Sequence, residues 1–409
     1  MLVQFSVKNF KSIKDEVTLD MQAASISEHG ESLLSDKTNE KFLPVSTIYG
    51  PNGGGKSNIL EALDALIEKV RLPIALTLNP GASSILNTVK SSEIVPYLFS
   101  QESKNNPTEF ELFFRTDVAE YRYNMQIKKN KILYESFDRL SFETNRISEL
   151  FERENNNISL RGSFSKLKIT NSISEELPFL SYLGITYRNN EIINDSMKFI
   201  MTQFGFADLG NPFNESIATI IKEKHIKTLL LDSLKEMDIS IEDFRIDEYQ
   251  KVIYTKHNVN GCNTELLLKD ESSGTKKLFA VLPGLILGLE LGSVLLIDEL
   301  DAKLHPALLE YIINLFTNPE INKHNAQLIF TSHDLSTMNN EVFRRDEIWF
   351  VAKGNEQNSQ LYSLIEFRDE NGTTIRKDSI YNKQYLEGKY GADPYLRKII
   401  DWEKVYGKK

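Results

Sequence analysis

The sequence predicts an α/β fold that combines an N-terminal antiparallel β-subdomain, a mixed central sheet and a largely helical lid insert. Three observations lead to this prediction. Short strands with alternating apolar residues fill the first part of the chain, apolar residues at helical spacing dominate the middle, and strands alternate with helices near the end. We therefore expect residues 1–140 and 241–370 to form one domain, with an insert at 141–240 and a tail at 371–409.

The composition is that of a globular protein. Of 409 residues, 41% are hydrophobic and 26% charged, which excludes wholesale disorder. The single cysteine, Cys262, excludes an intrachain disulfide, and the first ten residues alternate like a strand rather than a signal peptide. We therefore expect a cytoplasmic protein. The net charge of −10 argues against a uniformly basic nucleic-acid binder, although a local basic groove stays compatible with it.

The first half of the domain reads as strands around one helix. The expected elements are strands at 2–10 and 17–21, a loop at 25–41, a strand at 43–49, a helix that ends at Pro73 and an antiparallel meander over 108–161. Alternating apolar residues predict the strands, polar clusters predict the turns, and apolar residues at helical spacing predict the helix.

The insert and the second half read as helices followed by an alternation of strands and helices. The expected elements are helices within 175–237, strands at 244–254 and 265–268, a helix at 277–290, a strand at 293–298, a helix at 306–316, a strand at 327–331 and a hairpin of 347–352 with 360–366. The apolar run 278–297 is long enough to cross a bilayer, but Pro283 and three glycines interrupt it. We expect a buried helix and strand there, and no membrane partner.

A glycine-rich loop follows the strand at 43–49. Residues 50–57 match G-x-x-x-x-G-K-S between a strand and a helix, the context that a phosphate-binding P-loop requires. Its backbone amides can surround phosphate oxygens, and the helix N-terminus adds positive potential. Lys56 is expected to reach the β- and γ-phosphates, and the Ser57 hydroxyl to bind Mg²⁺. The expected nucleotide-binding residues are Gly50, Asn52, Gly53, Gly54, Gly55, Lys56, Ser57 and Asn58.

Two carboxylates end the apolar strand 294–297. Asp298 is expected to bind the Mg²⁺ together with Ser57, and Glu299 to orient or deprotonate the attacking water. Taken alone, such a pair is more often a solvated strand end. The P-loop in the same chain favours the catalytic interpretation.

Two further segments can bind phosphate. Ser272–Lys277 opens an apolar helix, and the hydroxyls and amides of such a helix cap can also hold an anion. His333 follows the strand at 327–331, where ligands of parallel sheets bind, and is expected to contact the γ-phosphate or water. His305, just before Pro306, is compatible with a helix start or with a site residue.

Together these motifs resemble the head of ABC-type ATPases. In that resemblance residues 50–57 are the Walker A motif, Ser272–Lys276 the signature, Asp298 and Glu299 the Walker B pair, Asp301 the D-loop residue and His333 the switch histidine. Residues 5–12 are similar to the start of SMC, RecF and OLD-type heads. The long insert and the tail at 385–394 resemble the AAA15/AAA21 group, which includes phage-defence companion ATPases of the RloA, AbiL and AriA type.

The resemblance implies a P-loop ATPase that uses ATP and Mg²⁺. It implies a homodimer or higher homo-oligomer in which Ser273 and Gly274 contact the nucleotide of the opposite chain. It also implies a separate effector protein, a nuclease or toxin, in bacterial anti-phage defence, with the tail as a partner-docking segment. The signature reads Ser-Ser-Gly-Thr-Lys instead of the usual Leu-Ser-Gly-Gly-Gln. In the dimer that the resemblance implies, Lys276 therefore brings a positive charge near the opposed phosphate.

The alternative is a RecF- or SMC-like DNA-maintenance ATPase. Basic residues that could bind DNA are Lys128, Lys129, Lys131, Arg161, Lys166 and Lys168. Such residues are more often a solvated face, and the chain lacks the long heptad arms of SMC proteins. Glu299 disfavours a binding module without turnover, and the insert and the N-terminal hairpin disfavour a transporter ATPase.

Overall fold

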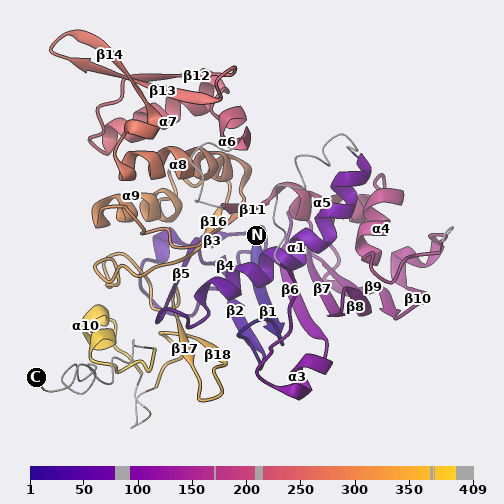
Figure 1. The fold of residues 1–409 in the computed structure, drawn as a ribbon. Helices are drawn as coiled ribbons and strands as arrows, with labels where there is room; N and C mark the ends of the chain where they lie inside the picture. Colours follow the sequence, from indigo (N-terminus) through magenta and orange to yellow (C-terminus); the bar gives the residue numbers. More distant parts are fainter. Residues whose placement is uncertain (79–92, 170–171, 208–214, 369–371, 373, 393–409) are drawn as a thin grey trace, which may run out of the picture.

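The computed structural model describes residues 1–78, 93–169, 172–207, 215–368, 372 and 374–392. In this part of the chain a seven-stranded antiparallel sheet and a six-stranded mixed sheet form the body of the molecule. A three-stranded sheet projects from that body at the top of Figure 1. The predicted α/β class, with an antiparallel N-terminal sheet and a mixed central sheet, is therefore confirmed.

The seven-stranded sheet has the order β10-β9-β8-β7-β6-β1-β2. Its strands are β1 Leu2–Lys8, β2 Val17–Asp20, β6 Thr108–Arg115, β7 Ala119–Lys128, β8 Lys131–Ser141, β9 Arg146–Glu154 and β10 Asn157–Leu160. All neighbours pair antiparallel, and buried residues alternate with less buried ones along β6 and β7, because one face packs on helices. The expected hairpin and meander are both present.

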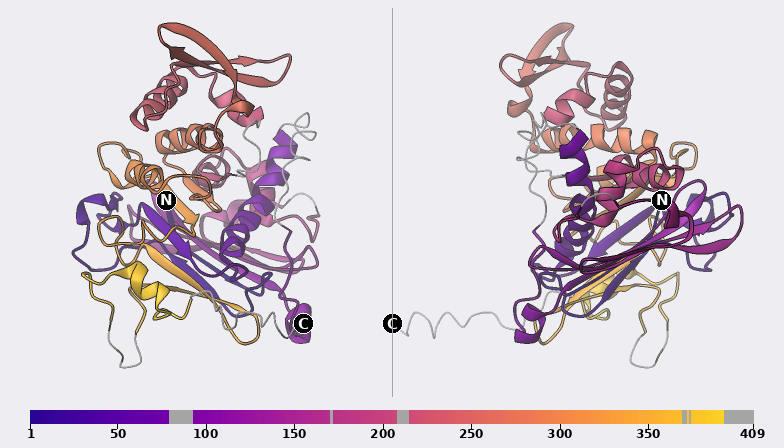
Figure 2. Two further views of the ribbon diagram at one scale, coloured as in Figure 1. Left: turned by 60° about the vertical axis from the view of Figure 1, so that its left-hand side comes forward. Right: turned by 90° about the vertical axis from the view of Figure 1, so that its right-hand side faces the viewer.

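Three helices cover one face of this sheet (Figure 2, right). They are α1 Lys56–Leu78, α4 Phe179–Thr186 and α5 Glu191–Thr202. Phe199 of α5 stacks on Phe114 of β6 with ring centroids 4.5 Å apart. The buried Glu135 carboxylate of β8 accepts the N–H groups of Phe179 and Leu180, which satisfies two donors at the start of α4. Helix α1, which begins at the P-loop lysine, packs on α4 and α5 and shares their core with the sheet.

Helix α1 does not end at Pro73, as the sequence predicted, but continues to Leu78. Proline removes one helical hydrogen bond and crowds the preceding turn. Here Ile74 remains 2% exposed in the core, and the Ser181 hydroxyl of α4 donates to the carbonyl oxygen of Val70 at 2.8 Å. Packing against α4 thus stabilises the helix through the proline.

The mixed sheet has the order β11-β15-β16-β5-β17-β18. Its strands are β5 Val45–Tyr49, β11 Phe204–Ala207, β15 Val294–Ile297, β16 Gln327–Thr331, β17 Ile348–Lys353 and β18 Ser359–Ser363. The first five strands in that order pair parallel, and β18 pairs antiparallel to β17. Helices α8 Ser273–Leu291 and α9 Pro306–Thr317 pack on it. The carboxyl ends of β15, β16 and β5 consequently meet at one edge.

The insert differs from the boundary that we predicted. Residues 146–160 form β9 and β10, the end of the meander predicted over 108–161, so they belong to the antiparallel sheet although the boundary at 141 places them in the insert. Helices α4 and α5 share one core with α1, and β11 joins the mixed sheet. The part that projects in Figure 1 contains α6 Glu215–Ile220, α7 Lys224–Glu236, β12 Asp243–Asp247, β13 Val252–Val259 and β14 Cys262–Leu267. Apolar spacing predicted the helices correctly, but it does not say which sheet a helix packs on.

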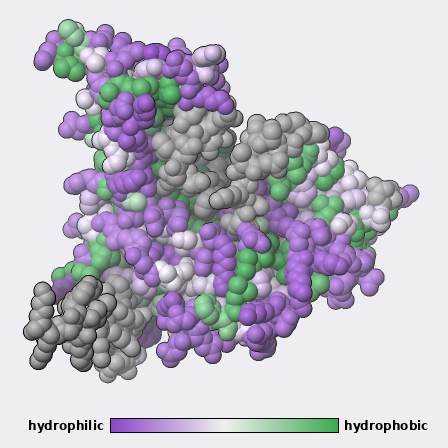
Figure 3. All heavy atoms as spheres, in the orientation of Figure 1, coloured by the Kyte–Doolittle hydropathy of each residue, from purple (hydrophilic) through white to green (hydrophobic). Residues whose placement is uncertain are grey.

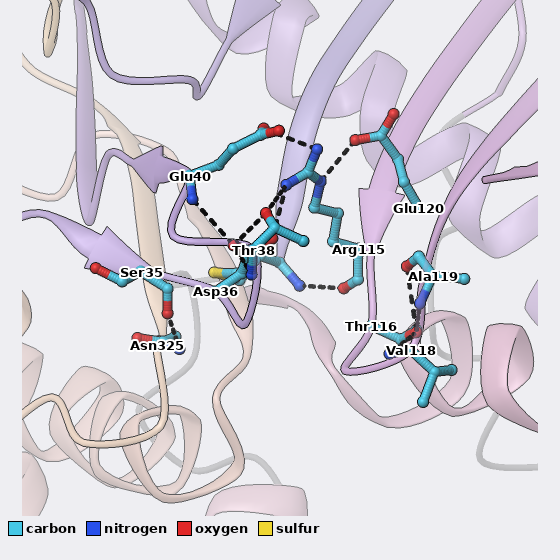
Figure 4. Close-up of polar contacts among 11 residues, drawn as sticks. Ser35, Asp36, Thr38, Glu40, Arg115, Thr116, Val118, Ala119, Glu120 and Asn325 are labelled. Carbon is cyan, nitrogen blue, oxygen red and sulfur yellow. Dashed lines mark hydrogen bonds and ion pairs between the residues drawn. The ribbon is translucent and has the colours of Figure 1, made fainter. Parts of the chain in front are cut away.

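An ion-pair cluster around Arg115 ties the loop at 25–41 to β6 (Figure 4). The guanidinium of Arg115 is within 2.6 Å of Asp36 and Glu120 and within 2.8 Å of Glu40. Two short strands, β3 Leu34–Ser35 and β4 Lys41–Phe42, flank this loop. The segment that the sequence predicts as a plain loop is therefore anchored at its centre.

The described part of the tail docks on the molecule itself. Helix α10, Tyr381–Leu386, places the ring of Tyr385 on that of Phe350, and the ring of Tyr390 also stacks with Phe350. The partner-docking prediction covers residues 371–409, of which 371, 373 and 393–409 lie outside the described residues. A further short helix, α3 Gln101–Asn105, lies near the lower end of the antiparallel sheet in Figure 1.

The surface on the side shown in Figure 3 is largely hydrophilic, with apolar residues in small separate patches. None of the described helices has both the length and the hydrophobicity that a bilayer crossing needs.

Candidate functional site

Three parallel strands bring the predicted motifs to one edge of the mixed sheet. The P-loop follows β5, His333 follows β16, and Asp298 follows β15. Strand β16 lies between the other two, so the histidine segment separates the P-loop from the carboxylates. Ligands of open parallel sheets bind at this edge, which makes it the candidate site.

The P-loop is braced by side chains from two distant segments. Asn58 donates to the Ser12 hydroxyl at 2.6 Å, Ser12 contacts Ser359 at 2.6 Å, and the Ser359 hydroxyl donates to the carbonyl oxygen of Gly54 at 2.6 Å. Gly55 has a φ of +106°, and a Cβ at this position would collide with both serine hydroxyls. The loop is thus held open in a conformation that requires glycine.

Lys56 begins α1 and is 6% exposed. Its Nζ donates to the carbonyl oxygen of Gly50 at 2.9 Å. Burial lowers the pKa of Lys56, and the carboxylates of Asp298, Glu299 and Asp301 partly offset that effect. A buried ammonium beside a helix N-terminus favours an anionic ligand, which would stabilise its charged form.

Thr331 connects the carboxylate turn, which we define as residues 298–303, to the end of β16. Its hydroxyl donates to Asp298 Oδ1 at 2.6 Å and accepts the N–H of Glu299 at 2.7 Å. Asp298 is half-buried, whereas the Glu299 side chain is exposed. Glu299 has a φ of 48°, a left-handed conformation that is uncommon for residues other than glycine. The turn therefore holds Asp298 inward and presents the Glu299 carboxylate to solvent.

The histidine segment also contacts the carboxylate turn. The N–H of His333 donates to Asp301 Oδ2 at 3.1 Å, while the His333 side chain is exposed at the site edge. Asp301 Oδ1 is buried and has no hydrogen-bond partner among the described residues. His305 caps α9, because its Nδ1 accepts the N–H of Ala307 at 3.2 Å. This contact favours the helix-start interpretation of His305.

The signature turn, Ser272–Gly274, opens α8. The Ser272 side chain caps the helix by accepting the N–H of Thr275 at 3.1 Å, and both Ser272 and Ser273 are exposed. Within the described part of the chain, no hydrogen bond or ion pair joins Ser273 or Gly274 to the P-loop. Lys276 points away from the turn and donates to the carbonyl oxygen of Lys269 at 2.9 Å.

Lys277 follows Lys276 directly in the sequence, but its side chain is buried whereas that of Lys276 is only partly buried. It is 9% exposed, and its Nζ donates to the carbonyl oxygen of Glu299 at 2.7 Å. Burial lowers the pKa of Lys277 to about 8, although Asp301 and Glu299 act against that shift. Sequence reasoning did not single out this residue.

The residues Gly50–Asn58, Asp298, Glu299 and His333 therefore follow three neighbouring strands at one edge of the sheet. Ser273 and Gly274 lie beside the carboxylate turn at the start of α8, without a hydrogen bond to the P-loop among the described residues. The contributions of Ser12, Ser359 and Lys277 were missed. Ser12 lies in the opening motif at residues 5–12, which could have marked it. Nothing in the local sequence marks Ser359, because its partner Gly54 lies 305 residues earlier.

The outer face of the seven-stranded sheet carries a hollow of about 460 Å³. Six of its lining residues are acidic, namely Glu16, Glu109, Glu111, Asp138, Glu149 and Glu152. Arg161 forms ion pairs with Glu149 and Glu152, and Lys131 pairs with Glu175 at 2.7 Å. DNA binding depends on positive charge that is free to meet phosphates, and the carboxylates engage Arg161 and Lys131. Among the described residues no ion pair engages Lys128, Lys129, Lys166 or Lys168, so these four keep the DNA-maintenance alternative open.

The comparisons with known proteins agree with the resemblance to the AAA21 group. A family model described as "AAA domain, putative AbiEii toxin, Type IV TA system" matches residues 45–339. No curated protein matches the chain.

Solved structures give weak matches that cover most of the chain. The SMC head domain from Thermotoga maritima shares 16% identity at a TM-score of 0.43, over 88% of this chain and 98% of that one. An SMC head bound to the C-terminal winged-helix domain of ScpA shares 15% identity at a TM-score of 0.45, over 88% of this chain and 97% of that one.

Proposed function

This chain belongs to the AAA-domain family whose model spans residues 45–339, a family of ATPases, and on that premise we propose that it is an ATP-driven switch. It binds and hydrolyses ATP, dimerises around the nucleotide and regulates a separate effector, a nuclease or toxin, in bacterial anti-phage defence. The family description itself names a toxin and a toxin–antitoxin system, which supports an effector of this kind.

The observation that carries the proposal is the meeting of three motifs at one sheet edge. The P-loop, the carboxylate turn and His333 follow β5, β15 and β16, which are neighbours in the sheet. Thr331 binds both the Asp298 carboxylate and the backbone N–H of Glu299, so the Asp298 carboxylate and the backbone from which the Glu299 side chain extends are held beside β16. Nucleotide hydrolysis requires positioning and charge stabilisation of this kind rather than covalent chemistry.

The residues of the edge fit the nucleotide and its magnesium ion. The glycine-only conformation at Gly55 leaves the backbone of the loop open to an anion, and Lys56 supplies a buried positive charge. The Ser57 hydroxyl and the Asp298 carboxylate are oxygen donors of the type that Mg²⁺ prefers. When bound, Mg²⁺ neutralises charge on the phosphates. Glu299 accepts a proton from the attacking water, and His333 contacts the γ-phosphate.

The signature turn supports the dimer. Ser272 and Ser273 are exposed, and they lie at the N-terminus of a 19-residue helix, where backbone N–H groups lack helical partners. A helix N-terminus of this kind can bind a phosphate group. Two copies related by a two-fold axis would each offer Ser273 and Gly274 to the nucleotide in the P-loop of the other.

The test is the solution mass of Glu299→Gln measured by light scattering with and without Mg-ATP. We expect the mass to double from 46.9 kDa when Mg-ATP is added, because ATP that is not hydrolysed holds the two heads closed. The double variant Lys56→Ala/Glu299→Gln is the control and is expected to remain at the monomer mass. A Glu299→Gln variant with normal ATP turnover would contradict the role of Glu299, and a mass independent of ATP would contradict nucleotide-driven dimerisation.

A further inference from the structure

Lys277 lies where the signature turn meets the carboxylate turn, and the proposed chemistry does not use it. It sits in the first turns of α8, four residues after Ser273. Its side chain is almost completely buried, yet its ammonium group is directed at a backbone atom, the carbonyl oxygen of Glu299, at 2.7 Å. Because a buried charge costs free energy unless it is hydrogen-bonded, the contact with Glu299 stabilises the buried ammonium group.

The contact also concerns the backbone of Glu299. Its N–H donates to Thr331, and its carbonyl oxygen accepts both Lys277 Nζ and, at 3.1 Å, the N–H of Ala302. A left-handed conformation at a residue other than glycine is strained and persists only where surrounding contacts impose it. Thr331 and Lys277 are the two side chains that hold both polar backbone atoms of Glu299, and they come from different elements.

The start of α8 has a second contact with the same turn. A Cβ placed on Gly274 would be 3.3 Å from the carbonyl oxygen of Lys303, so the backbone of the signature turn packs directly against the carboxylate turn. The two contacts, Lys277 with Glu299 and Gly274 with Lys303, join the turns at both ends. A displacement of the signature turn is therefore transmitted to the backbone of Glu299.

We propose that Lys277 is a positioning residue that couples the signature turn to Glu299 of the same chain. The inference rests on the proposed function, since it requires the dimer and the role of Glu299. In a two-fold dimer each chain contributes its signature turn to one nucleotide site and its Glu299 to the other. Docking of Ser273 on the partner's nucleotide thereby orients Glu299 at the chain's own nucleotide, and hydrolysis at the two sites becomes interdependent.

The activity test compares Lys277→Met with Lys277→Arg and Lys227→Met. Methionine keeps the length and apolar part of the side chain but cannot donate to the carbonyl oxygen. Lys227 is the matched control, because its Nζ also donates to a backbone carbonyl, that of Phe244 at 2.8 Å, but it lies on α7, in the projecting part. We expect Lys277→Met to lower kcat on the order of tenfold to a hundredfold, as misplaced catalytic groups do.

The pattern of the kinetic change identifies the role. Since Lys277 does not contact the P-loop, Lys277→Met should leave the ATP affinity and KM within about twofold. The Hill coefficient for ATP should fall to 1, while Lys277→Arg restores part of both kcat and cooperativity and Lys227→Met behaves as wild type. A fall in kcat with an unchanged Hill coefficient would overturn the coupling, and so would a loss of ATP affinity.

Amide hydrogen exchange of the nucleotide-free proteins separates this inference from the proposed function. Loss of the Lys277 contact should speed exchange of the amides at residues 299–304, and Lys227→Met should not. Equal exchange in Lys277→Met and wild type would overturn the positioning role even if ATP is hydrolysed. A wild-type protein that hydrolyses no ATP, but shows the exchange difference, would contradict the proposed function and leave the positioning contact supported.

Discussion

The P-loop and the signature turn are two glycine-containing turns at helix N-termini, and the structure holds them in different ways. Ser12 and Ser359 close on the P-loop from distant parts of the chain, and Lys56 is buried behind it. At the signature turn Ser272 and Ser273 face solvent, and the contacts are those of a helix cap. In the proposed function, the P-loop binds the nucleotide of its own chain, and the signature turn contacts the nucleotide of another copy.

The largest effect is expected at the P-loop, where Lys56→Ala should weaken ATP binding by about a hundredfold or more. Hydrogen bonds to charged groups are worth about 1.5–3 kcal/mol each, and a lysine that reaches two phosphates makes more than one. Isothermal titration with non-hydrolysable ATP measures the change. Lys69→Ala, on the same helix, is the control, because Lys69 binds the Asn130 side chain at 2.6 Å and should leave the affinity unchanged. An unaltered ATP affinity in Lys56→Ala would contradict the assignment of the P-loop as the phosphate-binding turn of its own chain.

A substitution in the signature turn should have the complementary effect. Ser273→Arg adds a bulky side chain to an exposed position, so the fold and the ATP affinity of the monomer are expected to stay as in the wild type. ATP turnover should fall by about tenfold or more, because a clash at a dimer contact removes the closed state. In the Glu299→Gln background the mass should remain that of a monomer with Mg-ATP. Weaker ATP binding by the Ser273→Arg monomer would mean that Ser273 acts within its own chain.

Two of the four glycines of the P-loop, Gly53 and Gly55, separate steric from conformational requirements. Gly53 and Gly55 both have positive φ, +71° and +106°, but only Gly55 has the Ser12 and Ser359 hydroxyls in the space of a Cβ. Gly53→Ala should cost about 1 kcal/mol for the left-handed backbone. Gly55→Ala should cost about 1–3 kcal/mol more in unfolding free energy and lower ATP affinity about tenfold, because the loop must shift. Urea titration measures the unfolding free energy of both variants, and a binding titration measures their ATP affinity. Equal losses of unfolding free energy would show that the serine brace, the hydroxyls of Ser12 and Ser359, moves aside for the added methyl group.

The sequence was sufficient where a feature depends on neighbours along the chain. The P-loop, the strand that ends at Asp298 and the β6–β8 meander are local patterns, and each is present. It failed where distant contacts decide. Pro73 did not end α1, because Ser181 and the packing of Ile74 compensate for the proline.

The same reason limited the prediction of the site. The residues that follow β5, β15 and β16 were identified, since the carboxyl ends of parallel strands share one edge. The side chains that hold those residues were not, because Ser359 acts on Gly54 across 305 positions and Lys277 acts on a backbone atom of Glu299. A motif states which groups do the chemistry, whereas the fold decides which groups position them.

The smallest effect is expected from the serine brace itself. Ser359→Ala removes the donor to the Gly54 carbonyl oxygen and the partner of Ser12, a loss of about 1 kcal/mol for a typical hydrogen bond. Without this hydrogen bond the P-loop keeps its conformation but becomes more mobile, and ATP binding must then order it. We therefore expect the ATP affinity to fall by about twofold to fivefold. Ser363→Ala, at another buried serine of β18, is the control and should leave the ATP affinity unchanged. If Ser359→Ala lowers the melting temperature but leaves ATP binding intact, the brace serves the fold alone, and the P-loop is no more preorganised for phosphate than the signature turn.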